Sequence, residues 1–201
     1  MIIFSQGSSA TYMVKGPGTI GAERHRVTLA ARHCIHNWWD PAQTPRGEIE
    51  KNILVVYGKH CRLETIGEDG TWLQSDRFRD TDGKWVVRRK GDKVPPQLMG
   101  TWRAVRQQAP HLLDSLLIWQ QPSACFDTVL WRWQQELTVK DHGGQAVIIS
   151  DALPCSWSEQ SRQSAWLLNL VQAPVGSGMT PLQQPTDTHM AKPAKDCDSI
   201  N

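Results

Sequence analysis

The sequence lacks the cysteine motifs, membrane helices and signal peptides that often indicate the class of a protein. Its five cysteines include no C-x-x-C pair and their number is odd, so neither a zinc framework nor a disulfide framework is indicated, and a reducing compartment is expected. No apolar run approaches the roughly 18 residues that a membrane helix needs. The apolar start at Met1 is too short for a signal peptide and has no basic flank. We therefore expect a soluble chain without a targeting signal.

Aromatic residues other than tryptophan are also scarce, with three Phe and two Tyr beside ten Trp. Trp offers a large apolar surface and one N–H donor, so its expected role is to anchor the packing of helices and strands. The charges nearly cancel, with 22 Lys and Arg against 20 Asp and Glu in 201 residues. Such a balance neither identifies nor excludes a nucleic-acid-binding protein, because local patches matter more than the sum. The length suits one domain.

The order of the expected elements predicts an α/β fold with a mixed sheet. These elements are short strands before residue 32, a loop over 33–50, a buried strand over 53–57, a helical region over 110–139 and a second buried strand over 146–150. A capping box formed by Ser156 and Glu159 predicts a helix that runs towards Leu167. A strand over 167–171 and a last helix from Asp187 are expected to follow.

Two further segments are expected to lie outside the core. The polar stretch 64–93 reads as a solvated hairpin or an insertion, with a turn at Asp82-Gly83. The tail over 196–201 is polar and is expected to fray.

Two aspartates stand where a metal site would be built. Asp151 ends the buried strand over 146–150, and Asp187 follows a Pro-flanked turn. Functional groups collect at the carboxyl ends of strands in open α/β sheets, and carboxylates that converge there suit Mg²⁺ or Mn²⁺. Two such ions activate a water or a 3′-hydroxyl in phosphodiester chemistry. From spacing alone, however, the commoner role of an Asp at the start of a helix is to cap it, so both interpretations stay open.

The histidines do not add to this site. His33, His36 and His60 are expected on separate loops, and no spacing brings two of them onto one face of an element. None of them is predicted to be a metal ligand.

Residues 171–193 resemble a specific family. The stretch VQAPVGSGMTPLQQPTDTHMAKP is similar to the DDE-superfamily endonucleases, the transposase catalytic cores of the pogo, Tigger and jerky kind. In that family an apolar strand and a Pro/Gly loop lead to T-x-L-Q-P-x-D and a helix, and Thr180 to Asp187 follows the pattern with one extra Gln. By this resemblance Asp187 is the third catalytic acid, and the stretch AVIISDALP makes Asp151 the second.

Less specific matches extend the resemblance over most of residues 1–195. They are ERHRVTLAA over 23–31, which resembles an R-x-T strand, NILVVYGK over 52–59, which resembles a P-x-x-I-x-x-G-K segment, and TYMVKGPGT over 11–19, which resembles a Lys-Gly turn. The resemblance implies an RNase H-like mixed sheet flanked by helices, with acids on strands one and four and on a late helix. It also implies DNA as the partner, Mg²⁺ or Mn²⁺ held by Asp151 and Asp187, and a nuclear location.

The chain departs from the family at three points. The first acid of the family lies in a D-E-T or D-Q-T motif on the first strand, but no Asp precedes Asp40 and Glu23 is the only earlier acid. We therefore expect the chain to start after the first catalytic residue, with a sheet that is incomplete at its first strand. Cys155 and Ser156 stand where the family often has a His. The helix-turn-helix that usually precedes such a core has no counterpart.

Three functions remain open from the sequence. The first is a transposon-derived DDE core that cleaves DNA with divalent metal, or descends from one, and is inactive alone. The second is a domesticated, non-catalytic module that binds nucleic acid or protein through its Trp residues and the basic run Arg88-Arg89-Lys90. The third is an unrelated α/β protein in which the motif occurs by chance.

Overall fold

The computed structural model describes residues 2–13, 24–36, 40–44, 46–143, 146–151 and 153–175. The chain divides into two compact units. Unit 1 comprises residues 1–8, 30–50 and 131–201, and unit 2 comprises residues 9–29 and 51–130. Strands β1 (Ile2–Met13) and β2 (Arg24–His36) each contribute to both units, and the first three residues of helix α3 (Thr128–His142) belong to unit 2.

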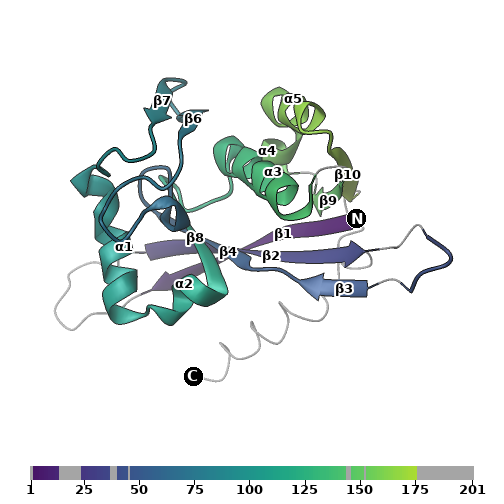
Figure 1. The fold of residues 1–201 in the computed structure, drawn as a ribbon, viewed down its shortest axis with the longest axis horizontal. Helices are drawn as coiled ribbons and strands as arrows, with labels where there is room; N and C mark the ends of the chain where they lie inside the picture. Colours follow the sequence, from purple (N-terminus) through teal and green to yellow (C-terminus); the bar gives the residue numbers. More distant parts are fainter. Residues whose placement is uncertain are drawn as a thin grey trace. The chain divides into compact units, whose positions relative to one another are not determined.

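The described part of unit 1 combines parallel strands with helices. Its remaining elements are β3 (Arg46–Ile49), α3 (Thr128–His142), β9 (Val147–Asp151), α4 (Pro154–Trp157), α5 (Glu159–Leu167) and β10 (Val171–Val175). β9 pairs in parallel with β1 on one side and with β10 on the other, and β3 pairs antiparallel with β2. Figure 1 shows α3, α4 and α5 on the same side of β1. Leu130 and Trp133 of α3 are buried, as their helical spacing predicts.

Unit 2 is built around a second parallel pair. Its elements are β4 (Asn52–Tyr57), β5 (Cys61–Arg62), a 3-10 turn over Leu63–Thr65, β6 (Asp76–Arg79), β7 (Trp85–Arg88), α1 (Pro96–Gln108), α2 (His111–Ser115) and β8 (Leu116–Gln121). β8 pairs in parallel with β4 and antiparallel with β5, and β6 and β7 form a separate hairpin. The core of this unit gathers Cys61, Leu63, Ile66, Trp72, Val94, Leu98, Met99, Trp102 and Ile118.

The strand order of the main sheet is β10-β9-β1-β2-β4-β8-β5, with β3 beside β2. The mixed α/β sheet with flanking helices that the sequence predicts is therefore confirmed. In this order β1 is the direct neighbour of β9. Among the helices in the described ranges, none is long and apolar enough to cross a membrane.

Two expected elements are wrong in part. The helical region expected over 110–139 contains β8, because the run Leu116–Gln121 is buried over its last four residues and completes a pair with β4. The loop expected over 33–50 contains the end of β2 and the whole of β3, which pair with each other. Both segments are short strands whose partners are distant in sequence, so their own residues do not reveal the pairing.

The region over 64–93 forms the expected hairpin but is not simply solvated. β6 and β7 pair around the turn at Asp82-Gly83, where Gly83 has φ +75. Trp72 and Phe78 are each only 4% exposed. The polar residues of this stretch therefore cover an apolar interior.

The helix after β9 is capped differently from the expectation. Ser158, not Ser156, is the N-cap of α5, and its hydroxyl oxygen accepts a hydrogen bond from the backbone N–H of Ser161. The sequence predicts a strand over 167–171. In the structure Leu167 is the last residue of α5, a turn with Asn169 at φ 56 follows, and β10 begins at Val171. The last helix expected from Asp187 and the tail over 196–201 lie outside the described residues.

Candidate metal-binding site at the end of β9

Asp151 is the last residue of β9, the central strand of three parallel strands. The run Val147 to Ser150 is β-branched and apolar except at its end, and Ile148 and Ser150 are almost fully buried. A strand covered on both faces requires such a run. The backbone of Asp151 pairs with Val175 of β10. Asp151 therefore stands at the carboxyl edge of a parallel sheet, the position at which α/β proteins place functional groups.

The neighbouring strand brings no acid to this edge. Ser5 of β1 is the register partner of Ser150, and extending that register by one residue sets the backbone of Gln6 beside Asp151. The sequence of β1, IIFSQGSSATYM, contains neither Asp nor Glu. The first acid that the family resemblance implies thus has no counterpart on this strand.

Asp187 and its motif over 180–193 lie outside the described residues, so the approach of Asp187 to Asp151 stays a prediction. The structure does describe Cys155 and Ser156, which stand where the family often has a His. The hydroxyl of Ser156 is buried and donates to the carbonyl oxygen of Leu153 at 2.8 Å. The carbonyl oxygen of Cys155 accepts from the hydroxyl of Ser161 at 2.5 Å. Ser156 thus ties α4 to the residue before it, and Cys155 links α4 to α5.

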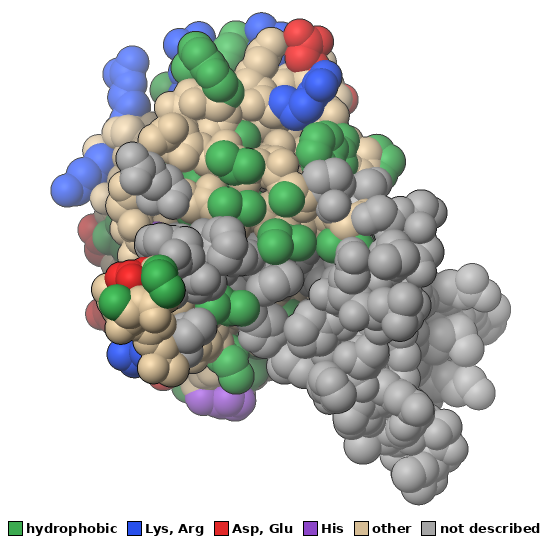
Figure 2. All heavy atoms as spheres, turned by 90° about the vertical axis from the view of Figure 1, so that its right-hand side faces the viewer, with side chains coloured by type: hydrophobic (Ala, Val, Ile, Leu, Met, Phe, Trp, Pro, Cys, Tyr) green, Lys and Arg blue, Asp and Glu red, His purple; other side chains and the backbone are tan. Residues whose placement is uncertain are grey.

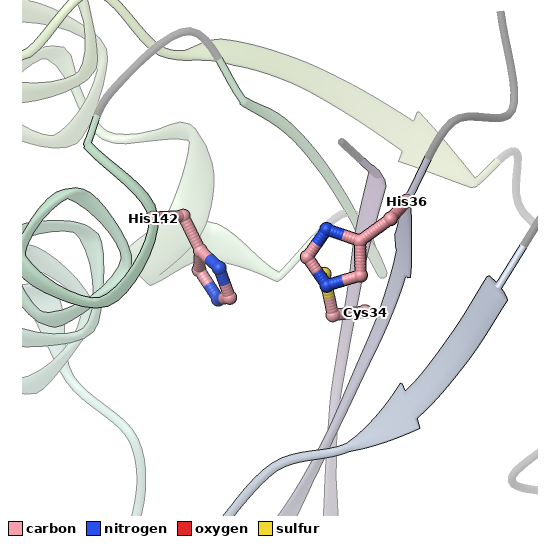
Figure 3. Close-up of side chains that lie close together, drawn as sticks. All are labelled: Cys34, His36 and His142. Carbon is pink, nitrogen blue, oxygen red and sulfur yellow. The ribbon is translucent and has the colours of Figure 1, made fainter. Parts of the chain in front are cut away.

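A second group of potential ligands lies elsewhere in unit 1. Cys34 and His36 of β2 approach His142 at the end of α3 (Figure 3), and one ligand atom from each residue lies within 4.8 Å of the others. Glu50 contacts Nε2 of His142, and its other oxygen lies 2.7 Å from the Arg32 guanidinium. The expectation that His36 lies on a loop is therefore wrong, since it ends β2. The only sequence signal was the Cys34-x-His36 spacing on a strand, since His142 is distant in sequence.

Unit 2 contains a cavity of about 580 Å³ beneath the hairpin. Its lining includes His60, Phe78 and Arg88. Nε2 of His60 lies 2.6 Å from Oδ2 of Asp127. The Arg88 guanidinium donates to the carbonyl oxygen of His60 and lies 4.5 Å from the centre of the Trp72 ring.

Arg88 is only 7% exposed, so the prediction that it contacts a partner as part of the run Arg88-Arg89-Lys90 is wrong. Burial lowers the pKa of Arg88 from its ordinary value. A different set of side chains faces outward from the hairpin. Arg77, Arg79 and Trp85 are all exposed, and both guanidinium groups stack on the Trp85 ring.

Comparisons with known proteins add little to this picture. No family model matches the sequence, and no curated protein matches it either. Among solved structures, the catalytic domain of Mos1 mariner transposase aligns with a TM-score of 0.34 and 11% identity over 98% of this chain and 61% of that chain. A structure of the same domain with Raltegravir and Mn gives the same values, and a pre-cleavage Mos1 transpososome gives a TM-score of 0.32 with 11% identity over 98% of this chain and 42% of that chain.

The chain therefore spans about 61% of the length of the first of these structures. At TM-scores of this size the likeness carries no argument about function. The interpretation of the site at the end of β9 therefore rests on its own residues and on the strand order of the sheet.

Proposed function

We propose that this chain is the core of a DDE-type transposase whose set of catalytic acids is incomplete. The observation that carries the proposal is the position of Asp151 at the end of β9, beside β1 and between two parallel neighbours. The family resemblance implies acids on strands one and four, and we assign β1 and β9 to these strands, since they are direct neighbours in this sheet. Asp151 and Asp187 would hold Mg²⁺ or Mn²⁺, which supplies a metal-activated water and stabilises the leaving oxygen of a DNA phosphodiester.

Loss of one acid explains why the chain is expected to be inactive alone. A two-metal site needs carboxylates that neutralise both ions and hold them about 4 Å apart. Ser5 and Gln6, the residues of β1 in register with the end of β9, are uncharged. Metal affinity and cleavage should both fall severely. By the same resemblance the partner is DNA and the location is the nucleus.

Restoring the acid tests this proposal. The parent chain, Ser5→Asp and Gln6→Asp are compared for nicking of supercoiled plasmid in Mn²⁺. We expect the parent to match the protein-free background and at least one of the two variants to exceed it by about tenfold or more, equivalent to about 1.4 kcal/mol of barrier. Thr11→Asp, on the same strand beyond the paired segment, should stay at background.

The active variant then receives Asp151→Ala, which should return it to background. The proposal fails if neither acid restores nicking, or if nicking persists without Asp151.

A non-catalytic nucleic-acid-binding module is the second candidate, and the outward face of the β6–β7 hairpin favours it. Arg77 pairs with Val87 across the hairpin and Arg79 with Trp85, so these four side chains share one exposed face. An exposed Trp flanked by two Arg combines a stacking platform for a base with positive charge for phosphates.

A further inference from the structure

Cys34, His36 and His142 form a compact group of potential metal ligands at the end of β2. Cys34 and His36 are two residues apart on a strand, so they share one face. Their Sγ and Nε2 atoms are 3.3 Å apart. The ring of His142 lies across from that of His36, with centroids 5.8 Å apart (Figure 3).

This spacing suits zinc. Tetrahedral zinc with Zn–S of about 2.3 Å and Zn–N of about 2.0–2.1 Å separates its ligand atoms by roughly 3.3–3.6 Å. The Sγ of Cys34 and the Nε2 of His36 already have this separation. The three ligand atoms all lie within 4.8 Å of one another, so only a short movement of His142 is needed to complete the set. One thiolate with two imidazoles is a ligand set that selects zinc over Mg²⁺.

The same group is poorly built for thiol catalysis. Cys34 is fully buried, whereas a catalytic thiol must meet its substrate. Nε2 of His36 contacts both the thiol and Glu48, at 3.4 Å, so the carboxylate does not hold the other ring nitrogen as it would in a triad.

Two carboxylates lie beside the group. Glu50 contacts Nε2 of His142, as an outer partner does when it fixes the ring of a histidine ligand through the nitrogen that does not bind the metal. Glu48 contacts the same Nε2 of His36 that faces Cys34, so its carboxylate is placed as a fourth ligand and not as an outer partner. Arg32, which precedes Cys34 by two residues on the same face, holds Glu50 in place at 2.7 Å.

The group is separate from the site at Asp151. His142 ends α3 and precedes β9, so it belongs to the amino end of that strand, whereas Asp151 is the last residue of the strand. At about 3.3 Å per residue, the five residues of β9 place these ends roughly 13 Å apart.

We propose that Cys34, His36 and His142 bind one zinc ion that joins β2 to the end of α3, with water or a neighbouring carboxylate as the fourth ligand. The site is structural, since it ties two elements of unit 1 that are distant in sequence. This inference does not depend on the proposed function.

The full chain is stripped with chelator and titrated with Zn²⁺ and with Co²⁺. We expect one equivalent of either ion, a thiolate-to-cobalt charge-transfer band with tetrahedral d–d absorption, and a rise in Tm of about 5–10 °C in excess Zn²⁺. Cys34→Ser, His36→Asn and His142→Asn should each remove the band and the Tm rise. Cys125→Ser and His111→Asn, which change a free cysteine and a histidine of unit 2, should leave both unchanged.

Circular dichroism of each metal-free variant distinguishes a variant that fails to fold from one that folds but has lost a metal ligand. His36 is the ligand least expected to unfold the chain, because 32% of its side chain is exposed. The proposal is overturned if no thiolate band forms in the parent chain, or if the band survives either Cys34→Ser or His142→Asn.

Discussion

The guanidinium carbon of Arg77 lies 4.1 Å from the centre of the Trp85 ring, and Arg79 stacks on the same ring at 4.9 Å. Trp85 remains 49% exposed in this arrangement. Three side chains that the sequence places in a polar stretch therefore form one cationic and aromatic surface on the β6–β7 hairpin. Figure 2 shows the face on the right-hand side of Figure 1, where hydrophobic side chains are interspersed with polar ones.

Substitutions of Trp85 and Arg77 on this surface should weaken the binding of single-stranded DNA, each in a distinct way. Trp85→Ala should weaken binding of an oligo-dT probe by about 1–3 kcal/mol, because it removes the stacking platform for a base. Arg77→Ala should lower the slope of log affinity against log salt by about one, because one phosphate contact is lost. Fluorescence anisotropy at several salt concentrations measures both effects.

Trp166 provides the matched control. It is 80% exposed on α5, and Trp166→Ala should leave the affinity unchanged. Equal losses from the Trp85 and Trp166 substitutions would mean that the hairpin is not the contact surface.

Arg88 should be a stability residue and not a binding residue. Its side chain is buried, stacks on Trp72 and Phe78, and lies 3.9 Å from Asp76. Arg88→Ala leaves that carboxylate without one of its cationic neighbours and should lower the free energy of unfolding by about 3–5 kcal/mol. Urea denaturation measures this change, and the exposed neighbour in Arg89→Ala should cost less than about 0.5 kcal/mol. If the two variants are equally stable, Arg88 does not pack as described.

Cys61 should make stability depend on alkaline pH. Burial raises the pKa of its thiol from 9.0 to about 12. The unfolded chain therefore releases this proton at a lower pH than the folded chain, so the contribution is complete below pH 9 and is lost as the pH rises towards 12. The slope is at most about 1.4 kcal/mol per pH unit for one proton.

The measurement compares urea denaturation of the parent chain and of Cys61→Ala between about pH 8 and pH 10.5, where groups shared by both chains cancel. The parent should lose stability more steeply with pH than Cys61→Ala. An unchanged slope in Cys61→Ala would show that the Cys61 thiol does not titrate as predicted.

The buried strands were predictable from sequence because their signal is local. The runs at β4 and β9 are apolar and β-branched, and each forms a strand between two neighbours. β8 is equally apolar, but a run of six residues fits a buried helix as well as a strand. Its pairing with β4 decides between them, and pairing is a tertiary property.

The candidate sites show the same division. The position of Asp151 at the end of a strand was predictable because it follows a short, β-branched apolar run, which favours a buried strand. The approach of His142 to Cys34 was not, since residues that are distant in sequence meet only through the pairing and packing of unit 1. The burial of Arg88 was also hidden, because its aromatic neighbours come from other segments.

The central claim is that Asp151 and Asp187 share a divalent metal ion at the end of β9. An anomalous difference map from crystals grown with Mn²⁺ tests it most directly. The account predicts a manganese peak at the carboxyl edge of β9, with carboxylate oxygens of both residues about 2.1 Å from the ion. A map in which Asp187 lies away from Asp151 and no manganese binds at that edge would contradict it.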